Sequence, residues 1–251
     1  DMDNTLLTAK EGIPECNRTV IKLFTGMGGR FTVASGRPPE SVRAALGDIR
    51  LSLPAICCNG SLLYDFSTER VLRHATLERG QATAAILEIM EKFPRVGVEV
   101  MAGAGDMYVV RANPYTHAHQ VDEQLSGVAC PLDAVPDGWV KVVFAGDPEM
   151  IRKVGQYAKT RYYGRENYFL ATNSIYYEIM PAGVGKASAL RDLCALLGVP
   201  VENTVVIGDY YNDLEIMQAA GYSVAVSNAP PEVKAAADEV TNCTCSDGAV
   251  G

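Results

Sequence analysis

The chain lacks the features of several large protein classes. No apolar run approaches the roughly 18 residues that would indicate a membrane span, and we recognise no basic segment followed by an apolar leader. Lys and Arg number 22 against 30 Asp and Glu, so the formal net charge is −8. A surface of that sign repels polyanions and anionic membranes. We therefore expect a cytoplasmic protein with neither a nucleic-acid nor a membrane partner, in which a few local cations would hold any phosphate.

Cysteine and histidine are too few or too scattered to indicate a zinc site. The seven cysteines include no paired Cys-x-x-Cys spacing, although Cys57 and Cys58 are adjacent. We interpret them as reduced thiols that mostly fill the interior. The three histidines, His74, His117 and His119, form no ligand pattern, and we expect His117 and His119 to lie on a surface loop.

What the chain does contain is a repeated pattern of short apolar strands that stop at polar residues. With 251 residues, 48% of them apolar, the chain has enough material for one large domain or two ordinary ones. Nearly continuous apolar strands that alternate with helical periodicity indicate a parallel sheet covered on both faces. Ligands of such sheets bind beyond the carboxyl ends of the strands. The strands are expected at 30–34, 54–58, 204–208 and 222–226, and they end at Ser35, Asn59, Asp209 and Ser227.

The middle of the chain has a different pattern of expected helices and strands. A helix is expected at 81–93, followed by a hairpin of 96–101 and 107–111 across a Gly-rich connection. Further strands are expected at 140–145, 168–172 and 175–179, with a helix at 149–162. We therefore predict a discontinuous core of residues 1–76 and 182–251, interrupted by an α+β domain of residues 77–181.

Two carboxylates open the sequence, two positions apart. In an extended chain Asp1 and Asp3 would point to the same side, towards one metal ion and one phosphate. The alternative is a solvated turn. We also expect a strand to lead into Asp1 and a helix to begin near residue 246, because each end of the sequence interrupts such a pattern.

The polar residues after the later strands form three further motifs. Ser35-Gly36-Arg37 follows a strand, and Gly185-Lys186 begins a helix. A lysine at a helix N-terminus is unfavourable by a few tenths of a kcal/mol or more, so an anionic group should offset it. The last motif is the segment 208–213, which follows a strand and contains Asp209 and Asp213. For each motif an ordinary role stays open: a strand-end cap, a surface lysine or a helix N-cap.

These motifs, in this order, resemble those of the haloacid dehalogenase (HAD) superfamily of phosphatases. Those motifs are Asp-x-Asp-x-Thr-Leu-Leu, Ser-Gly-Arg, Gly-Lys and Gly-Asp-x-x-Asn-Asp. The Asn59-Gly60 segment and the insert after the second motif are similar to the Cof-type subgroup, subfamily IIB, whose insert is a C2B cap. The resemblance runs essentially end to end. It implies an α/β fold with a parallel-sheet, Rossmann-like core and an inserted cap.

The resemblance also implies a role for each motif residue. Asp1 would attack phosphorus to give an aspartyl-phosphate, and Asp3 would act as acid and then base. Mg²⁺, which prefers oxygen ligands, would be held by Asp1, the main-chain carbonyl of Asp3, Asp209 and Asp213. The phosphate or substrate would be bound by Ser35, Gly36, Arg37, Asn59, Lys186 and Asn212. For Arg37 and Asn212, a solvated or capping role is an open alternative.

One position departs from the family pattern. Asn4 stands where most members have glycine, but asparagine tolerates left-handed backbone well enough for the turn to survive. The expected substrate is a small phosphorylated metabolite, with sugar phosphates first and phosphorylated cofactors such as pyridoxal phosphate or flavin precursors next. The protein is expected to be a monomer or homodimer. Cap residues that could read the substrate are Tyr108, Arg111, Tyr115, Tyr163, Tyr168 and Tyr176.

Two alternative functions fit parts of the same pattern. A sugar phosphomutase can have the same fold and would yield an isomeric sugar phosphate rather than inorganic phosphate. A non-catalytic phosphate-binding or phospho-accepting module also places aspartates at strand ends, but it would need neither Asp3 nor an insert of about a hundred residues.

Overall fold

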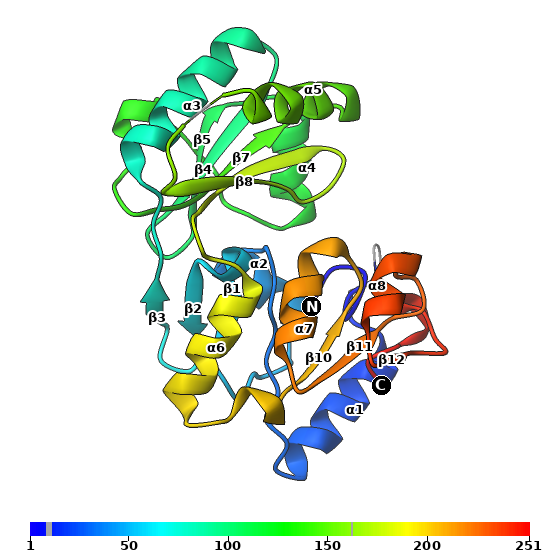
Figure 1. Ribbon diagram of the computed structural model, residues 1–251. Coiled ribbons are helices and arrows are strands. Elements are labelled where there is room, and N and C mark those ends of the chain that lie inside the picture. The colour runs from blue at the N-terminus through cyan, green and yellow to red at the C-terminus, as the bar shows by residue number, and fades with distance from the viewer. Residues whose placement is uncertain (9–11, 162) are drawn as a thin grey trace. The chain divides into compact units, whose positions relative to one another are not determined.

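The computed structural model describes residues 1–8, 12–161 and 163–251, which form two compact units (Figure 1). The core unit comprises Asp1–Arg37, Val42–Arg73 and Gly185–Gly251. The insert unit comprises Pro38–Ser41 and His74–Val184. Among the described residues, no helix is both long enough and apolar enough to cross a membrane.

The first helices of the core unit are α1 (Glu15–Gly26) and α2 (Pro39–Leu46). The first three residues of α2 are grouped with the insert unit. Strands β1 (Ala55–Cys57), β2 (Leu62–Asp65) and β3 (Arg70–His74) follow, with the 3-10 turn η1 (Cys58–Gly60) after β1. The second half contains α6 (Lys186–Leu197), η3 (Val201–Asn203), β10 (Val205–Gly208), η4 (Tyr211–Asp213), α7 (Leu214–Ala219), β11 (Tyr222–Ala225), α8 (Pro231–Ala236), β12 (Glu239–Val240) and η5 (Cys245–Asp247).

The predicted parallel strands are found in two separate pieces. β10, β11 and β12 pair in parallel in that order, which confirms the predicted strands at 204–208 and 222–226. The predicted strand at 30–34 is reduced to one parallel bridge, from Ala34 to Ile56, and β1 pairs antiparallel with β2. An apolar cavity of about 600 Å³ lies between the pieces and is lined by Val33 and Val206. The segment does run beside β1, since the N–H of Ile56 donates to the carbonyl of Val33 at 2.9 Å, but such bonds are too few here for a regular strand.

Helices cover the core strands through apolar contacts. Ile56 and Leu63 pack against Leu190 and Leu193 of α6. Met217 of α7 packs with β11 and α8. This burial explains why α6 forms where the sequence has apolar residues at helical spacing. The apolar residues of α1 are buried only in part: Ile21 is buried, while Leu23 and Phe24 are exposed.

The insert unit is a six-stranded sheet in the order β6-β5-β4-β7-β9-β8. The predicted hairpin is confirmed: β4 (Gly97–Ala102) pairs antiparallel with β5 (Asp106–Arg111). The remaining elements are α3 (Arg79–Lys92), α4 (Pro114–Asp122), β6 (Val128–Ala129), η2 (Leu132–Ala134), β7 (Trp139–Ala145), α5 (Pro148–Lys159), β8 (Asn167–Ala171) and β9 (Tyr176–Pro181). The predicted helix at 149–162 ends at Lys159, and residue 162 lies outside the described residues.

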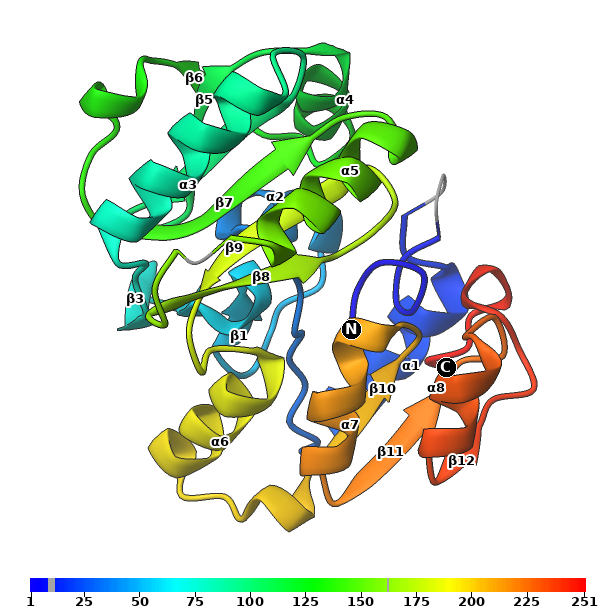
Figure 2. The same cartoon turned by 45° about the horizontal axis from the view of Figure 1, so that its top comes forward.

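The two faces of the insert sheet have different chemistry. Val98 and Val100 of β4 pack with Ile86 of α3 and Val154 of α5, so these helices cover one face (Figure 2). Side chains alternate along a strand, so Glu99 faces the opposite side, where it meets His119 of α4. One face is therefore an apolar core and the other carries buried charges.

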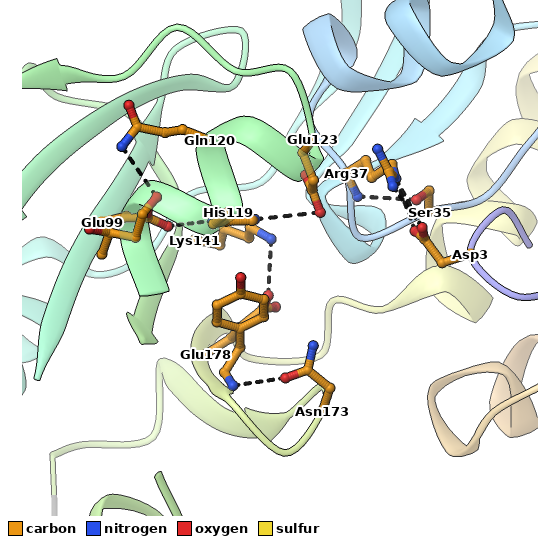
Figure 3. A network of polar contacts seen from close by, with 12 residues as sticks. Asp3, Ser35, Arg37, Glu99, His119, Gln120, Glu123, Lys141, Asn173 and Glu178 are labelled. Atoms are coloured by element: carbon orange, nitrogen blue, oxygen red, sulfur yellow. Dashed lines mark hydrogen bonds and ion pairs between the residues drawn. The ribbon is translucent and has the colours of Figure 1, made fainter. Parts of the chain in front are cut away.

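The prediction of a surface loop for His117 and His119 is wrong, because both lie on α4, where His117 is exposed and His119 is buried. His119 lies on α4, is 3% exposed, and its Nδ1 is 2.6 Å from Oε2 of Glu99 (Figure 3). Burial by itself lowers the pKa of His119, but hydrogen bonds and charges from Glu123 and Glu99 outweigh it and raise the pKa to about 10. On the same face Lys141 donates to Glu178 at 3.0 Å, and both are buried. The sequence could not show this, because the carboxylate partners are brought to His119 and Lys141 by the fold.

The cysteines are free thiols, as predicted. Four of them, Cys57, Cys58, Cys194 and Cys245, are buried. Burial raises the pKa of Cys57 well above its ordinary value, which keeps that thiol protonated and unreactive.

Candidate active site

A buried lysine joins two of the predicted carboxylates in the core unit. Nζ of Lys186 lies 2.5 Å from Oδ1 of Asp1 and 2.7 Å from Oδ1 of Asp213. The side chains of Lys186 and Asp213 are 2% and 1% exposed. The first turn of α6, where a lysine is unfavourable, therefore receives the anionic partners that the sequence led us to expect.

The turn after β10 brings the side chain of Asp213 back to the carboxyl end of β10. Oδ2 of Asp213 accepts hydrogen bonds from the main-chain N–H groups of Asp209 at 3.2 Å and Tyr210 at 3.4 Å. A Cβ at Gly208 would lie only 2.8 Å from that of Asp213. Glycine at 208 is therefore required for this turn, because any side chain there would displace the carboxylate.

Asp209 completes a group of three carboxylates. Thr5 donates its hydroxyl to Oδ1 of Asp209 at 3.0 Å. One carboxylate oxygen from each of Asp1, Asp209 and Asp213 lies within 4.8 Å of the other two. Burial, followed by the charge of Asp213, raises the pKa of Asp209. Burial would also raise the pKa of Asp213, but the charge of Lys186 outweighs it and lowers that pKa.

This group has the chemistry of a divalent-cation site. Three carboxylates gather around the ammonium of Lys186, and their oxygens are the hard donors that a divalent cation prefers. Burial and the neighbouring charge of Asp213, which raise the pKa of Asp209, both oppose its ionisation, and a bound cation would favour it. Asp1, Asp209 and Asp213 therefore fit Mg²⁺, whereas the carboxylate of Asp3 points elsewhere.

Ser35 and Asn59 are held by the main chain around the second motif. The Ser35 N–H donates to the carbonyl of Ile56, and its own carbonyl accepts from the N–H of Asn59, both at 2.9 Å. Asn59 adopts left-handed backbone with φ of 52°. A Cβ at Gly36 would lie 3.1 Å from Oδ1 of Asn59, so glycine leaves room for the buried asparagine side chain.

The third motif meets the Asn59-Gly60 segment through two glycines. A Cβ at Gly60 would lie 2.3 Å from the carbonyl oxygen of Gly185, immediately before Lys186. Gly60 also has φ of 99°, which other residues rarely adopt. The sequence signalled a glycine at each position, but only the fold shows that they approach each other.

Asp3 contacts a different cation from Asp1. Arg37 donates from Nη2 to Oδ1 of Asp3 at 2.7 Å and from Nε to Oδ2 at 3.0 Å (Figure 3). The phosphate contact predicted for Arg37 stays a prediction. Sequence reasoning missed this ion pair and the Thr5 hydrogen bond, although Asp3 and Thr5 both belong to the first motif.

The remaining predicted residues take these places. Asn212 lies in η4 directly before Asp213. Asn4 has φ of 57°, as expected for an asparagine that replaces glycine, and its carbonyl accepts from Nδ2 of Asn228 at 2.9 Å. The turn closes with the N–H of Leu7 on the carbonyl of Met2 at 2.8 Å.

The model of the haloacid dehalogenase-like hydrolases matches residues 1–250. The chain belongs to this family. Pyridoxal phosphate phosphatase YbhA of Escherichia coli (strain K12) is 26% identical over 262 residues, which cover 98% of this chain and 93% of that protein. This HAD-family chain is therefore a phosphatase of the same broad type.

Solved structures of the HAD superfamily share the fold. A haloacid dehalogenase-like hydrolase from Bacteroides thetaiotaomicron aligns with a TM-score of 0.89 at 23% identity, over 100% of this chain and 94% of that one. A subclass IIB sugar phosphatase of the superfamily aligns with a TM-score of 0.83 at 19% identity, over 99% and 94%. These likenesses confirm the predicted α/β class with a Rossmann-like HAD core.

Proposed function

We propose that the chain is a Mg²⁺-dependent phosphomonoester hydrolase that works through an aspartyl-phosphate. The observation that carries the proposal is the convergence of Asp1, Lys186, Asp209 and Asp213 from three distant parts of the chain. A buried lysine and carboxylates that can hold Mg²⁺ would together neutralise the negative charge of a phosphoryl group.

The reaction has two steps. A carboxylate oxygen of Asp1 attacks phosphorus, the bond from phosphorus to the substrate oxygen breaks, and Asp3 gives its proton to that oxygen. Water then attacks phosphorus, Asp3 takes a proton from the water, and the bond between phosphorus and Asp1 breaks. The products are the alcohol and inorganic phosphate, and both aspartates return to their starting states.

The surrounding residues stabilise charge in both steps. Lys186 holds a phosphoryl oxygen while it also orients Asp1. Asp1, Asp209, Asp213 and the main-chain carbonyl of Asp3 would hold Mg²⁺, which supplies neutralisation of the phosphate dianion. The Ser35 hydroxyl, main-chain N–H groups around Gly36, Asn59 and Asn212 complete the proposed phosphate and substrate contacts.

For the substrate we propose a small phosphorylated metabolite, with sugar phosphates first. The likeness to a structure named as a sugar phosphatase supports that class, and the relative named as a pyridoxal phosphate phosphatase supports phosphorylated cofactors as the next class to assay. We propose that the insert unit serves as the cap that selects among them, as in the domain assignment made from the sequence.

The test is a panel of hexose monophosphates and pyridoxal phosphate, assayed for released inorganic phosphate with Mg²⁺ or with a chelator. We expect Mg²⁺-dependent phosphate release that Asp1→Asn abolishes. An isomeric sugar phosphate in place of phosphate would establish a phosphomutase instead. One phosphorylation of Asp1 without turnover would establish a phospho-accepting module.

A further inference from the structure

The two aspartates of the first motif have separate cationic partners. Asp1 contacts Lys186, whereas Asp3 contacts Arg37. Arg37 engages both carboxylate oxygens of Asp3: Nη2 lies 2.7 Å from Oδ1, and Nε lies 3.0 Å from Oδ2 and 3.2 Å from Oδ1. A forked contact of this kind fixes the plane of the carboxylate as well as its position.

The main chain of Arg37 is held in place by its neighbours. Pro38 follows it, and a residue before proline is confined to extended backbone. Its N–H donates to Oγ of Ser35 at 3.1 Å, and its carbonyl accepts from the N–H of Cys58 at 3.0 Å. The main chain of Arg37 is thus tied to both the second motif and the end of β1.

Asp3 needs such a support more than Asp1 does. The side chain of Asp3 is 50% exposed, while that of Arg37 is 13% exposed. A half-exposed carboxylate on a tight turn can occupy several rotamers, and fixing one of them costs side-chain entropy. The largely buried guanidinium of Arg37, whose main chain is fixed, would hold Asp3 in one rotamer before the substrate binds.

We propose that Arg37 is a positioning residue for Asp3, which it holds in the orientation for proton transfer. The inference rests on the proposed function, because it assigns a partner to the acid and base of that mechanism. It differs from the phosphate contact expected from the sequence, in which Arg37 would contribute to binding rather than to proton transfer. The geometry favours the positioning role because the fork of Arg37 lies on Asp3.

The test compares Arg37→Lys, Arg37→Gln, Asp3→Ala and the double variant Asp3→Ala with Arg37→Gln, with p-nitrophenyl phosphate and a hexose monophosphate as substrates. For Arg37→Gln we expect kcat to fall by roughly 10- to 100-fold with little change in KM, because displacing a catalytic group by about 1 Å has effects of this size. Inhibition by inorganic phosphate should keep its inhibition constant. Arg37→Lys, or guanidinium ion added to Arg37→Gln, should restore part of kcat.

Non-additivity is the decisive readout. In the Asp3→Ala background, Arg37→Gln should lower kcat no further, since the group that it positions is absent. Arg43→Ala is the matched control, because Arg43 pairs with Glu69 and both are more than half exposed. Circular dichroism and melting curves check that each variant folds.

Each possible outcome has a definite meaning. A rise in KM and in the phosphate inhibition constant for Arg37→Gln, with kcat kept, would overturn the inference in favour of phosphate binding. An additive further loss in the double variant would also overturn it. If Asp3→Ala kept full kcat, the acid and base role of the proposed function would fail first. If Asp3→Ala lost activity while Arg37→Gln kept it, this inference alone would fail.

Discussion

Each of the two units buries charged side chains, but the charges are balanced differently. In the insert unit the buried cations form ion pairs with carboxylates of the same unit: Lys141 with Glu178, and His119 with Glu99 and Glu123. In the core unit the carboxylates of Asp1, Asp209 and Asp213 gather around Lys186. Balanced pairs satisfy themselves within the fold, whereas an acidic excess requires a further positive charge. A buried ion pair by itself is therefore no sign of a reactive site, whereas several carboxylates around one lysine are suited to hold a further cation.

The largest effect is expected at the unbalanced cluster. Asp1→Asn removes the proposed nucleophile, so turnover should fall by at least roughly 1,000-fold. Phosphate release from a hexose monophosphate measures it. Asp48→Asn is the control, because Asp48 pairs with Arg18 and Lys22 on the surface. Equal losses in both variants would mean that the cluster is no more than a structural feature.

In the insert unit, a change to a balanced pair should act on stability. Lys141→Met leaves Glu178 buried without its ammonium partner, and breaking a buried pair in this way costs about 3–5 kcal/mol of unfolding free energy. The double variant Lys141→Met with Glu178→Leu should cost much less, since it buries no unpaired charge. Urea unfolding measures both.

The exposed pair Lys153–Glu149 serves as the reference for this test. Replacing Lys153 by Met should change the unfolding free energy by less than about 1 kcal/mol. If the single and double variants at 141 and 178 were equally destabilised, the ion pair would not be the relevant interaction.

The ion pairs of His119 with Glu99 and Glu123 predict a pH dependence. The folded-state pKa of His119 is raised from 6.5 to about 10, so its stabilising contribution is complete below pH 6.5 and is lost as the pH rises through 10. Urea unfolding at pH 6, 8 and 10 should show stability declining over this range. His119→Gln should flatten the decline, whereas His117→Gln, at an exposed position on the same helix, should leave it unchanged.

The smallest effect is expected at the turn that directly follows Asp1 and Asp3. Asn4 has φ of 57°, where alanine is disfavoured by about 1–2 kcal/mol. Asn4→Ala should therefore lower the unfolding free energy by about 1 kcal/mol, and Asn4→Gly should change it by less. Thermal or urea unfolding of the two variants checks the order. A loss with glycine equal to that with alanine would show that the asparagine side chain, and not the backbone angle, supports the turn.

Local patterns in the sequence were sufficient for much of the fold and for the motifs. The apolar runs at 204–208 and 222–226 became β10 and β11, and the Gly-rich connection became the β4–β5 hairpin. The awkward position of Lys186 also predicted an anionic partner. These features depend on residues close together in the chain, so periodicity, turn chemistry and helix-terminus electrostatics reveal them.

The tertiary structure decided which residues meet. It joined Arg37 to Asp3 and Thr5 to Asp209, carried His119 into a buried ion pair, and left the segment at 30–34 with a single bridge. Each of these outcomes depends on groups that lie between 20 and 204 positions apart in the chain. Side-chain charge and apolarity are properties of single residues and can be read from the sequence. The partner that balances a charge or pairs with a strand edge is set by packing of the whole chain.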